Sequence, residues 1–307
     1  MILEIKDQLE KIHKIRKGEI KEGLSLGIKS FDTYFRFKKG TFNIFLGHSN
    51  VGKTHTVLFF MFLYALKHDL RFLVYAGENE PYSIVKKLIE YKEGMPINKV
   101  DEEKLKEGSQ WVDSHFKLIS IEEQYTYQNL LQLGEQIKKG WDYHGYFIDP
   151  YNSLEKDRDL YRSLGGHEFD YKAASDMRQF CHKTGVALWL TAHAQTDALR
   201  KLHGAQHEYS GHPIAPMMSD CEGGGKWSNR CDNFIVLHRY IQHNLDWMVT
   251  HIHVRKVKDT DTGMMPTTLD SPVRIRSLIN NVGFSIEGDN MIELISNEHT
   301  GESISKT

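Results

Sequence analysis

The fold is decided by residues 41–67, which read TFNIFLGHSNVGKTHTVLFFMFLYALK. At the centre of this stretch, residues 47–54 (GHSNVGKT) match the pattern GxxxxGK[ST] between two apolar runs. In such a loop, successive backbone N–H groups curl around a phosphate, and the following helix adds its positive N-terminal dipole. Gly47 and Gly52 permit that curl. The stretch therefore predicts a strand, a phosphate-binding P-loop and a helix, in that order.

The P-loop residues have separate expected roles. Lys53 is expected to reach the β- and γ-phosphates, and the Thr54 hydroxyl is a candidate ligand of Mg²⁺. The alternative is a chance glycine-rich turn, but the strand before the loop and the helix after it both favour a P-loop. The loop residues expected to bind the nucleotide are Gly47, Ser49, Asn50, Val51, Gly52, Lys53, Thr54 and His55.

Two carboxylates are placed to complete this site. A P-loop needs a second metal-holding group at the end of a nearby strand, and Asp149 follows the apolar run GYFI. Hydrolysis also needs a group that activates water, and Glu78 follows the strand FLVYA, with Glu80 as the second candidate. The alternative is that either glutamate caps the helix beginning near Pro81, which suits Glu80 better because it directly precedes the proline. We expect Thr54 and Asp149 to form the metal site.

Short apolar runs alternate with longer helical stretches after residue 40, which is typical of βαβ units. Runs such as ALWLTA are apolar without alternation, as expected for strands covered on both faces. The sequence therefore predicts an α/β fold with a mostly parallel sheet flanked by helices. The expected strands are 41–46, 72–75, 116–121, 145–148, 186–191, 233–237 and 247–254, and the expected helices are 53–67, 81–91, 127–139 and 169–184. Two long polar stretches, 155–168 and 196–226, are expected to be functional or disordered loops.

The composition limits the class of protein. The chain has 307 residues, enough for one large domain with short appendages or for two small domains. Lys plus Arg total 39 against 41 acidic residues, so a formal charge of −2 gives no reason to expect nucleic-acid binding. Three cysteines form no disulfide framework, and 17 histidines lack a matched ligand cluster, so neither disulfides nor zinc is expected. The longest apolar run, 57–66, is too short to span a membrane.

The N-terminal 24 residues alternate in charge and carry few apolar side chains. Read as a helix, they place Ile2, Ile5, Leu9 and Ile12 along one narrow stripe. A helix with so little to bury usually packs against something else. A solvated, partly frayed terminus is the alternative.

The order of these motifs resembles the RecA-like motor domain of hexameric replicative DNA helicases. Within this DnaB-like superfamily, the resemblance is closest to the Twinkle-like and phage primase-helicase branch, and it spans residues 25–263. The segments that carry it are GIKSFD (27–32), the P-loop, Glu78, Asp149, LTAHAQ (190–195), GGGKWSNRCDN (223–233) and RKVKDTDTG (255–263). The resemblance implies a RecA-like P-loop core at 25–290, with 1–24 as an N-terminal linker helix docking on a neighbouring subunit and 291–307 as a C-terminal tail.

The resemblance also assigns catalytic roles. Glu78 matches the catalytic glutamate and Asp149 the Walker B aspartate. His193 matches the γ-phosphate sensor of the Twinkle-like branch, while the DnaB-like branch leaves Gln195 open; a histidine at a strand end is otherwise more often structural.

In the family, a basic KxR motif reaches the nucleotide of the adjacent subunit. Lys258 stands where the finger arginine is expected, with Lys256 as its partner. Because Lys cannot make the bidentate contact of a guanidinium, Arg255 is the alternative, and a solvated basic strand end is the other interpretation.

RecA-like rings bind single-stranded DNA through two loops, and the stretches 155–168 and 196–226 match them. The residues expected to contact DNA there and in the adjoining segments are Arg158, Arg162, Lys172, Arg200, Lys201, His203 and Lys226. Six copies of a few basic residues would make a basic channel from a nearly neutral subunit. The alternative is that these are solvated loop charges.

The function implied is an ATP- and Mg²⁺-dependent motor that forms a hexameric ring, moves 5′ to 3′ on single-stranded DNA and opens forked duplexes. A primase or helicase loader would be a further partner, and the expected location is the cytoplasm of a bacterial or phage-infected cell. The alternatives are a RecA/RadA-like recombinase forming filaments and a KaiC-like regulatory ATPase. The GGGK segment and the segment at 27–32 favour the helicase.

Overall fold

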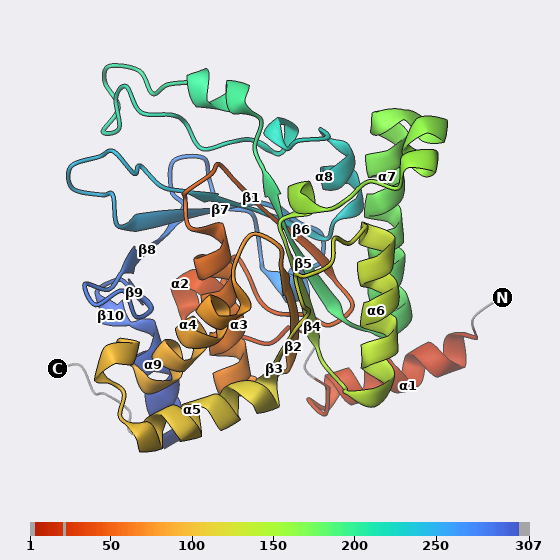
Figure 1. The fold of residues 1–307 in the computed structure, drawn as a ribbon, viewed down its shortest axis with the longest axis horizontal. Coiled ribbons are helices and arrows are strands. Elements are labelled where there is room, and N and C mark those ends of the chain that lie inside the picture. The colour runs from red at the N-terminus through yellow and green to blue at the C-terminus, as the bar shows by residue number, and fades with distance from the viewer. Residues whose placement is uncertain (1–3, 21–22, 301–307) are drawn as a thin grey trace.

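A ten-stranded sheet runs through the computed structural model, which describes residues 4–20 and 23–300 (Figure 1). Its strand order is β10-β9-β8-β7-β6-β1-β5-β4-β2-β3; β6 to β3 in this order are parallel, and β7 to β10 add an antiparallel extension. The strands are β1 (Phe42–Gly47), β2 (Phe72–Ala76), β3 (Phe116–Leu118), β4 (Gly145–Asp149), β5 (Ala187–His193), β6 (Asn233–His238), β7 (Val249–Val257), β8 (Val273–Ser277), β9 (Phe284–Ile286) and β10 (Asp289–Asn290). The predicted α/β fold with a mostly parallel core is confirmed.

Helices cover both faces of the sheet and bury one core on each (Figure 1). One face carries α2 (Lys29–Asp32), α3 (Lys53–His68), α4 (Pro81–Glu93), α5 (Glu102–His115) and α9 (Met291–Thr300); the other carries α6 (Tyr127–Gly140), α7 (Arg158–Thr184) and α8 (Lys226–Arg230). Short 3-10 helices lie at Ile97–Lys99, Tyr151–Ser153, Thr196–Arg200, Met218–Asp220 and Thr260–Thr262. Helix α3 is apolar on almost every side because it lies between the sheet and helices α4 and α9, so Val57 to Ala65 are all buried.

The register places the P-loop at the carboxyl edge of the parallel strands. Gly47, the last residue of β1, lies beside His193 of β5, and Leu46 lies beside Val236 of β6. The ends of β4 and β2 meet at the same edge, where Asp149 lies beside Ala76. The strand ends therefore bring the predicted site residues to one side of the sheet.

The seven predicted strands and four predicted helices are all present, and their ends are shifted by a few residues at most except at the start of helix α7. The stretch 155–168 differs from prediction, because helix α7 already begins at Arg158. The Asp157 side chain caps it by accepting from Leu160 N–H, and Tyr161 packs edge-to-face against Phe169. Gly165, at a φ of 75°, kinks the helix and interrupts the periodicity that would have indicated it.

The segment 291–307, expected as a C-terminal tail, begins with helix α9, whose Met291 and Ile295 side chains are buried in the core beside α3. Residues 301–307 lie outside the described residues. The boundaries 1–24, 25–290 and 291–307 stay predictions.

The N-terminal stretch forms helix α1 (Ile5–Arg16) at the lower edge of Figure 1. Ile5, Leu9 and Ile12 are 77%, 47% and 55% exposed, and Ile2 lies outside the described residues. None of the residues that the structure describes covers this apolar stripe, and docking on a neighbouring subunit stays a prediction. Across residues 4–20 and 23–300, no helix combines the length and apolar character needed to cross a membrane.

Candidate functional site

The P-loop adopts the curled backbone that its sequence requires. Asn50 and Gly52 have positive φ angles of 63° and 82°, and helix α3 starts directly after Gly52. Lys53 is buried, and its Nζ donates to the carbonyl oxygens of Gly47 (3.1 Å) and His48 (2.9 Å). Burial lowers the pKa of Lys53, while the carboxylates of Asp149 and Glu78 oppose that shift. The ammonium group is thus held inside the loop that is to receive phosphate.

The predicted metal ligands meet as the sequence requires. The Thr54 hydroxyl donates to one carboxylate oxygen of Asp149 at 2.6 Å, and the Thr191 hydroxyl donates to the other. Burial raises the pKa of Asp149, and the hydrogen bonds from Thr191 and Thr54 counteract it. Hydroxyl and carboxylate oxygens are the hard ligands that Mg²⁺ prefers. These residues fit a magnesium nucleotide.

A full protein cage for a metal is not found in the part of the chain that the structure describes. No group of three or more His, Cys, Asp or Glu side chains there is arranged to hold an ion. A cation held by Thr54 and Asp149 would therefore complete its shell with phosphate and water oxygens, which is the usual arrangement for Mg²⁺.

A cavity of about 360 Å³ lies over the P-loop. Its lining residues are Ser49, Asn50, Gly52, Lys53, Thr54, His55, Glu78, Asn79, Asp149, Pro150 and His193. Two predicted nucleotide-binding residues lie behind it instead: Val51 is 3% exposed and packs within 2.9 Å of where a Cβ on Gly47 would lie. Val51 and Gly47 shape the loop and are not among the residues that line the cavity.

Glu78 and Glu80 separate clearly in space. Glu78 lines the cavity, just after Gly77, whose N–H donates to the Asp149 carbonyl at 2.8 Å. Glu80 occupies the N-cap position of helix α4, where its backbone carbonyl accepts from Ser83 N–H at 2.9 Å and its side chain makes no capping hydrogen bond. The helix-capping interpretation therefore describes Glu80, and Glu78 keeps the role of candidate base.

His193 faces the P-loop from the end of β5. Its Nδ1 lies 3.5 Å from the Ser49 hydroxyl, and burial, followed by the charge of Lys53, lowers its pKa. A lowered pKa keeps the imidazole neutral at physiological pH. Gln195 lies outside the cavity lining, with its backbone N–H bonded to the Asp220 carbonyl at 2.8 Å. Of the two sensor candidates, the structure places only His193 at the cavity.

The finger candidates lie at the opposite edge of the sheet. Val257 pairs with Asn233, at the start of β6, so its neighbours Lys256 and Lys258 are far from the P-loop of their own chain. Lys256 donates to the carbonyls of Ser228 (2.6 Å) and Cys231 (2.8 Å).

Lys258 is 54% exposed and lies 3.9 Å from Asp232. Arg255, the alternative finger, is half-buried, and its Nε and Nη1 have no hydrogen-bond partner among the described residues. Any contact of Lys258 with a nucleotide would have to be made on another copy of the chain.

The first group of DNA candidates lies on helix α7. Arg158 and Arg162 are exposed on its first two turns, at the carboxyl edge of the sheet. Lys172 is three turns further along and forms an ion pair with Asp176 at 2.9 Å. The exposed arginines are therefore better placed for a ligand at this edge than Lys172.

The DNA candidates of the second loop, 196–226, form ion pairs and hydrogen bonds within the chain that the sequence does not predict. Arg200 pairs with Asp197 (3.1 Å), and Lys201 pairs with Asp220 (2.8 Å). His203 hydrogen-bonds the Tyr240 hydroxyl at 2.9 Å, and its ring stacks on His207. Lys226 begins helix α8 and is half-buried.

Arg239 lies beside the P-loop but belongs to none of the sequence motifs that predict the site. It follows β6, and its Nη1 lies 3.4 Å from where a Cβ on Gly52 would be. Its Nε and Nη2 donate to the Trp247 carbonyl at 3.2 and 2.5 Å, which fixes the guanidinium beside the P-loop. Because β6 is parallel to β1, its end must reach the P-loop edge, and that signal was available in the sequence.

The sheet topology and the P-loop at its carboxyl edge together define a RecA-like P-loop fold. The ATPase domain of G40P matches it with a TM-score of 0.69 and 14% sequence identity, covering 93% of this chain and 99% of that one. A DnaB-like replicative helicase, solved in a study of its interactions with primase, matches with a TM-score of 0.67 and 13% identity, covering 92% of this chain and 67% of that one.

Among curated proteins, the Twinkle homologue of Arabidopsis thaliana chloroplasts and mitochondria is 24% identical over 257 residues, or 79% of this chain. The chain spans about a third (34%) of that relative's length. No protein-family model matches the chain. The resemblance to the RecA-like domain of DnaB-like helicases, predicted from the sequence, is confirmed.

Proposed function

We propose that the protein is an ATP-driven DNA helicase motor that forms a ring, moves 5′ to 3′ on single-stranded DNA and opens forked duplexes. The observation that carries the proposal is the convergence of Lys53, the Thr54–Asp149 pair, Glu78 and His193 on one cavity at the carboxyl edge of the sheet. The replicative helicases among its structural neighbours and its Twinkle relative support the same class of motor.

Each of these five residues has a proposed chemical role in ATP hydrolysis. Lys53, which now donates to two loop carbonyls, would bind the β- and γ-phosphates. Thr54 and Asp149 would hold Mg²⁺, which would neutralise phosphate charge. The Glu78 carboxylate accepts a proton from the attacking water. The neutral imidazole of His193, close to Ser49, contacts the γ-phosphate.

The positions of the two halves of the site support assembly of several copies, which we propose to be a closed ring. The P-loop lies at one edge of the sheet and Lys258 at the other, so a complete site needs two copies of the chain. Repetition around a ring would also bring Arg158 and Arg162 of every copy to one channel, which gives a local basic surface despite the charge of −2 per chain. A primase or loader would act on this assembly.

The central experiment measures ATP hydrolysis with and without single-stranded DNA, together with unwinding of forks that carry either a 5′ or a 3′ single-stranded tail. We expect DNA to stimulate hydrolysis and only forks with a 5′ loading tail to open. Closed rings are expected by electron microscopy with ATP and DNA. Open filaments would support the recombinase instead, and hydrolysis indifferent to DNA would support the regulatory ATPase.

The trans role of Lys258 is tested by mixing two inactive variants, Lys53→Ala and Lys258→Ala. In an equal mixture, about a quarter of interfaces would combine an intact P-loop with an intact finger, so part of the hydrolysis should return. If Lys258→Ala alone keeps full hydrolysis, the finger assignment is wrong and the rest of the proposal stands.

A further inference from the structure

The second polar loop is closed at its base by a short pairing of its two ends. Ala194 forms a β-bridge with Cys221, and Gln195 N–H donates to the Asp220 carbonyl at 2.8 Å. Glu222 N–H donates to the His193 carbonyl at 3.1 Å. We call residues 193–195 and 220–222 the neck of the loop. The neck thus includes His193, the residue whose side chain faces the P-loop.

The Asn152 side chain joins this neck to the first loop. Asn152 lies in the 3-10 turn between β4, which ends in Asp149, and helix α7. Its Oδ1 accepts from His193 N–H at 2.9 Å, and its Nδ2 donates to the Glu222 carboxylate. A backbone N–H can only donate and a carboxylate can only accept, so a carboxamide suits both partners at once.

The residue after Glu222 brings the neck against helix α7. Gly223 has a φ of +88°, and a Cβ there would lie 2.6 Å from the Asp170 carboxylate and 2.8 Å from the Trp227 indole nitrogen. Only glycine fits this close approach. Residue 223 therefore lies directly against helix α7 at Asp170, on the same helix whose first turns carry Arg158 and Arg162.

We propose that Asn152 and Glu222 are positioning residues that couple the nucleotide state of the P-loop to both DNA-facing loops through the backbone of His193. Both hydrogen-bonding groups of the His193 backbone are engaged by this pair, while its imidazole faces Ser49. A shift of His193 toward the γ-phosphate must then move the turn before α7 and the neck together. The inference rests on the proposed helicase function, because it assigns these loops to DNA.

A donor–acceptor exchange tests the pair. Asn152→Asp still accepts from His193 N–H but opposes the Glu222 carboxylate with a second negative charge, which breaks the bridge. Glu222→Gln keeps an acceptor oxygen for Asn152. The double variant Asn152→Asp/Glu222→Gln restores the bridge with the donor now on position 222. Glu208→Ala serves as control, because Glu208 is an exposed carboxylate of the same loop that pairs with Arg274.

Hydrolysis rates without and with single-stranded DNA, and the KM for ATP, are measured for each variant. For Asn152→Asp we expect DNA stimulation to fall about fivefold or more, with DNA-free hydrolysis and KM within about twofold of wild type. Glu222→Gln and the double variant should keep most of the stimulation, as should Glu208→Ala. Thermal melting checks that all variants fold.

Two outcomes would overturn the inference. One is full DNA stimulation in Asn152→Asp; the other is a double variant that responds to DNA no better than Asn152→Asp. If Asn152→Asp does not fold, Glu222→Ala replaces it, with the same loss of stimulation expected. Wild-type hydrolysis that ignores DNA would instead refute the proposed function itself, so the two failures are distinguishable.

Discussion

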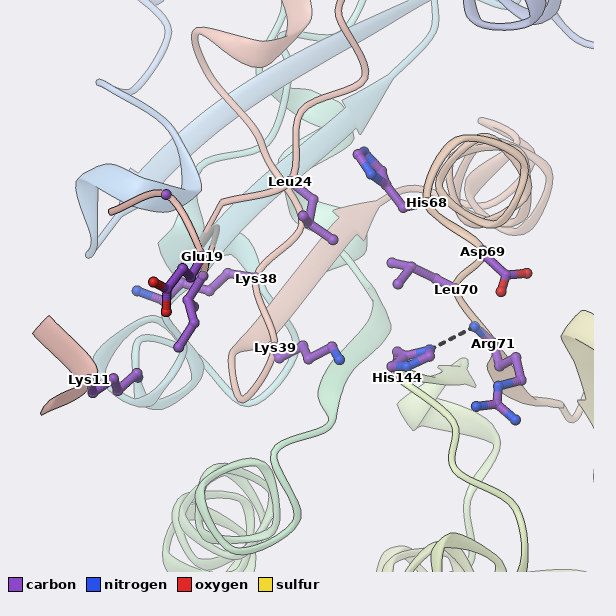
Figure 2. Close-up of a pocket in the computed structure, with 12 residues that line it drawn as sticks. Lys11, Glu19, Leu24, Lys38, Lys39, His68, Asp69, Leu70, Arg71 and His144 are labelled. Carbon is purple, nitrogen blue, oxygen red and sulfur yellow. Dashed lines mark hydrogen bonds between the residues drawn. The ribbon is translucent and has the colours of Figure 1, made fainter. Parts of the chain in front are cut away.

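The two edges of the parallel sheet both carry cavities lined by charged residues, but they differ in what those residues do. The cavity at the amino edge, below the starts of the parallel strands, measures about 770 Å³ against about 360 Å³ over the P-loop (Figure 2). Figure 2 shows Lys38, Lys39, Arg71 and His144 around it. The larger cavity therefore lies at the amino edge. The contacts of the side chains that line it nevertheless indicate that the ligand site is at the carboxyl edge.

At the amino edge, the polar groups are largely satisfied by their own chain. Lys38 pairs with Asp259 (2.6 Å) and Asp261 (3.1 Å), and His144 Nδ1 accepts from Arg71 N–H at 2.9 Å (Figure 2). Burial lowers the pKa of His144 to about 4, so the ring is neutral. At the carboxyl edge, side chains from several strand ends converge on one space beside a helix N-terminus. The ligand site of a parallel sheet is indicated by functional side chains that meet at the strand ends beside a helix N-terminus, and not by the volume of the cavity.

The largest expected effect separates two lysines at the two edges. Lys53→Ala should reduce ATP hydrolysis about 10³-fold, because it removes a preorganised positive charge from the phosphates. Lys39→Ala, an exposed lysine at the amino-edge cavity, should stay within about twofold of wild type. Phosphate release at saturating ATP measures both, and circular dichroism checks their fold. Equal losses in the two variants would break the comparison between the edges.

A second pair of variants, at Glu78 and Glu80, tests which glutamate at the carboxyl edge activates water. Glu78→Gln should lower kcat about 10²-fold with little change in the KM for ATP, because the amide cannot accept the proton of water. Glu80→Gln, two residues away on the cap of α4, should remain close to wild type. Steady-state kinetics over a range of ATP concentrations measures both. The assignment would have to be exchanged if Glu80→Gln were the slower enzyme.

The carboxyl edge could be predicted well because its signals are local. The P-loop pattern fixes β1 and α3, and parallel strands must end at the same edge, which placed Asp149, Glu78 and His193 near one another. Gln195 and Val51 failed to line the cavity because the exact path of a loop depends on packing that no motif encodes.

Elsewhere the signals were weaker. Helix α5 was not predicted because its sequence is mostly polar, with only Gly108, Val112 and His115 buried. Gly165 hid the first half of α7 by interrupting its periodicity. Arg239 belongs to none of the motifs that predict the site. The ion pairs of the second loop join residues whose approach depends on tertiary structure.

A third prediction concerns stability at the amino edge. A Cβ on Gly145, at the start of β4, would lie 2.5 Å from the ring of Phe72, its partner on β2. Gly145→Ala should therefore lower the free energy of unfolding by about 1–3 kcal/mol through overpacking, while the KM for ATP is retained. Gly140→Ala is the matched control, because nothing lies within 4 Å of its Cβ position. Urea unfolding measures both, and equal stability of the two variants would show that Phe72 moves aside without cost.

The smallest expected effect concerns the ion pairs of Lys38, which hold the segment that follows Lys258. The hydrogen bond from Lys38 is the main cause of the lowered pKa of Asp259, and the Asp259 side chain is 42% exposed. Lys38→Ala should therefore lower the free energy of unfolding by only about 0–1 kcal/mol at neutral pH. Because the pKa of Asp259 is lower in the folded state, its pairing stabilises the protein above pH 3.8, its ordinary value, and is lost as pH falls through the lowered value.

The difference in unfolding free energy between wild type and Lys38→Ala should accordingly shrink in acid, and urea titrations across that range measure it. Lys39→Ala should show no such pH dependence. A difference that persists in acid would mean that the Lys38 stem stabilises the fold by packing. Loss of the difference in acid would show that the ion pairs of Lys38 with Asp259 and Asp261 hold the segment after Lys258.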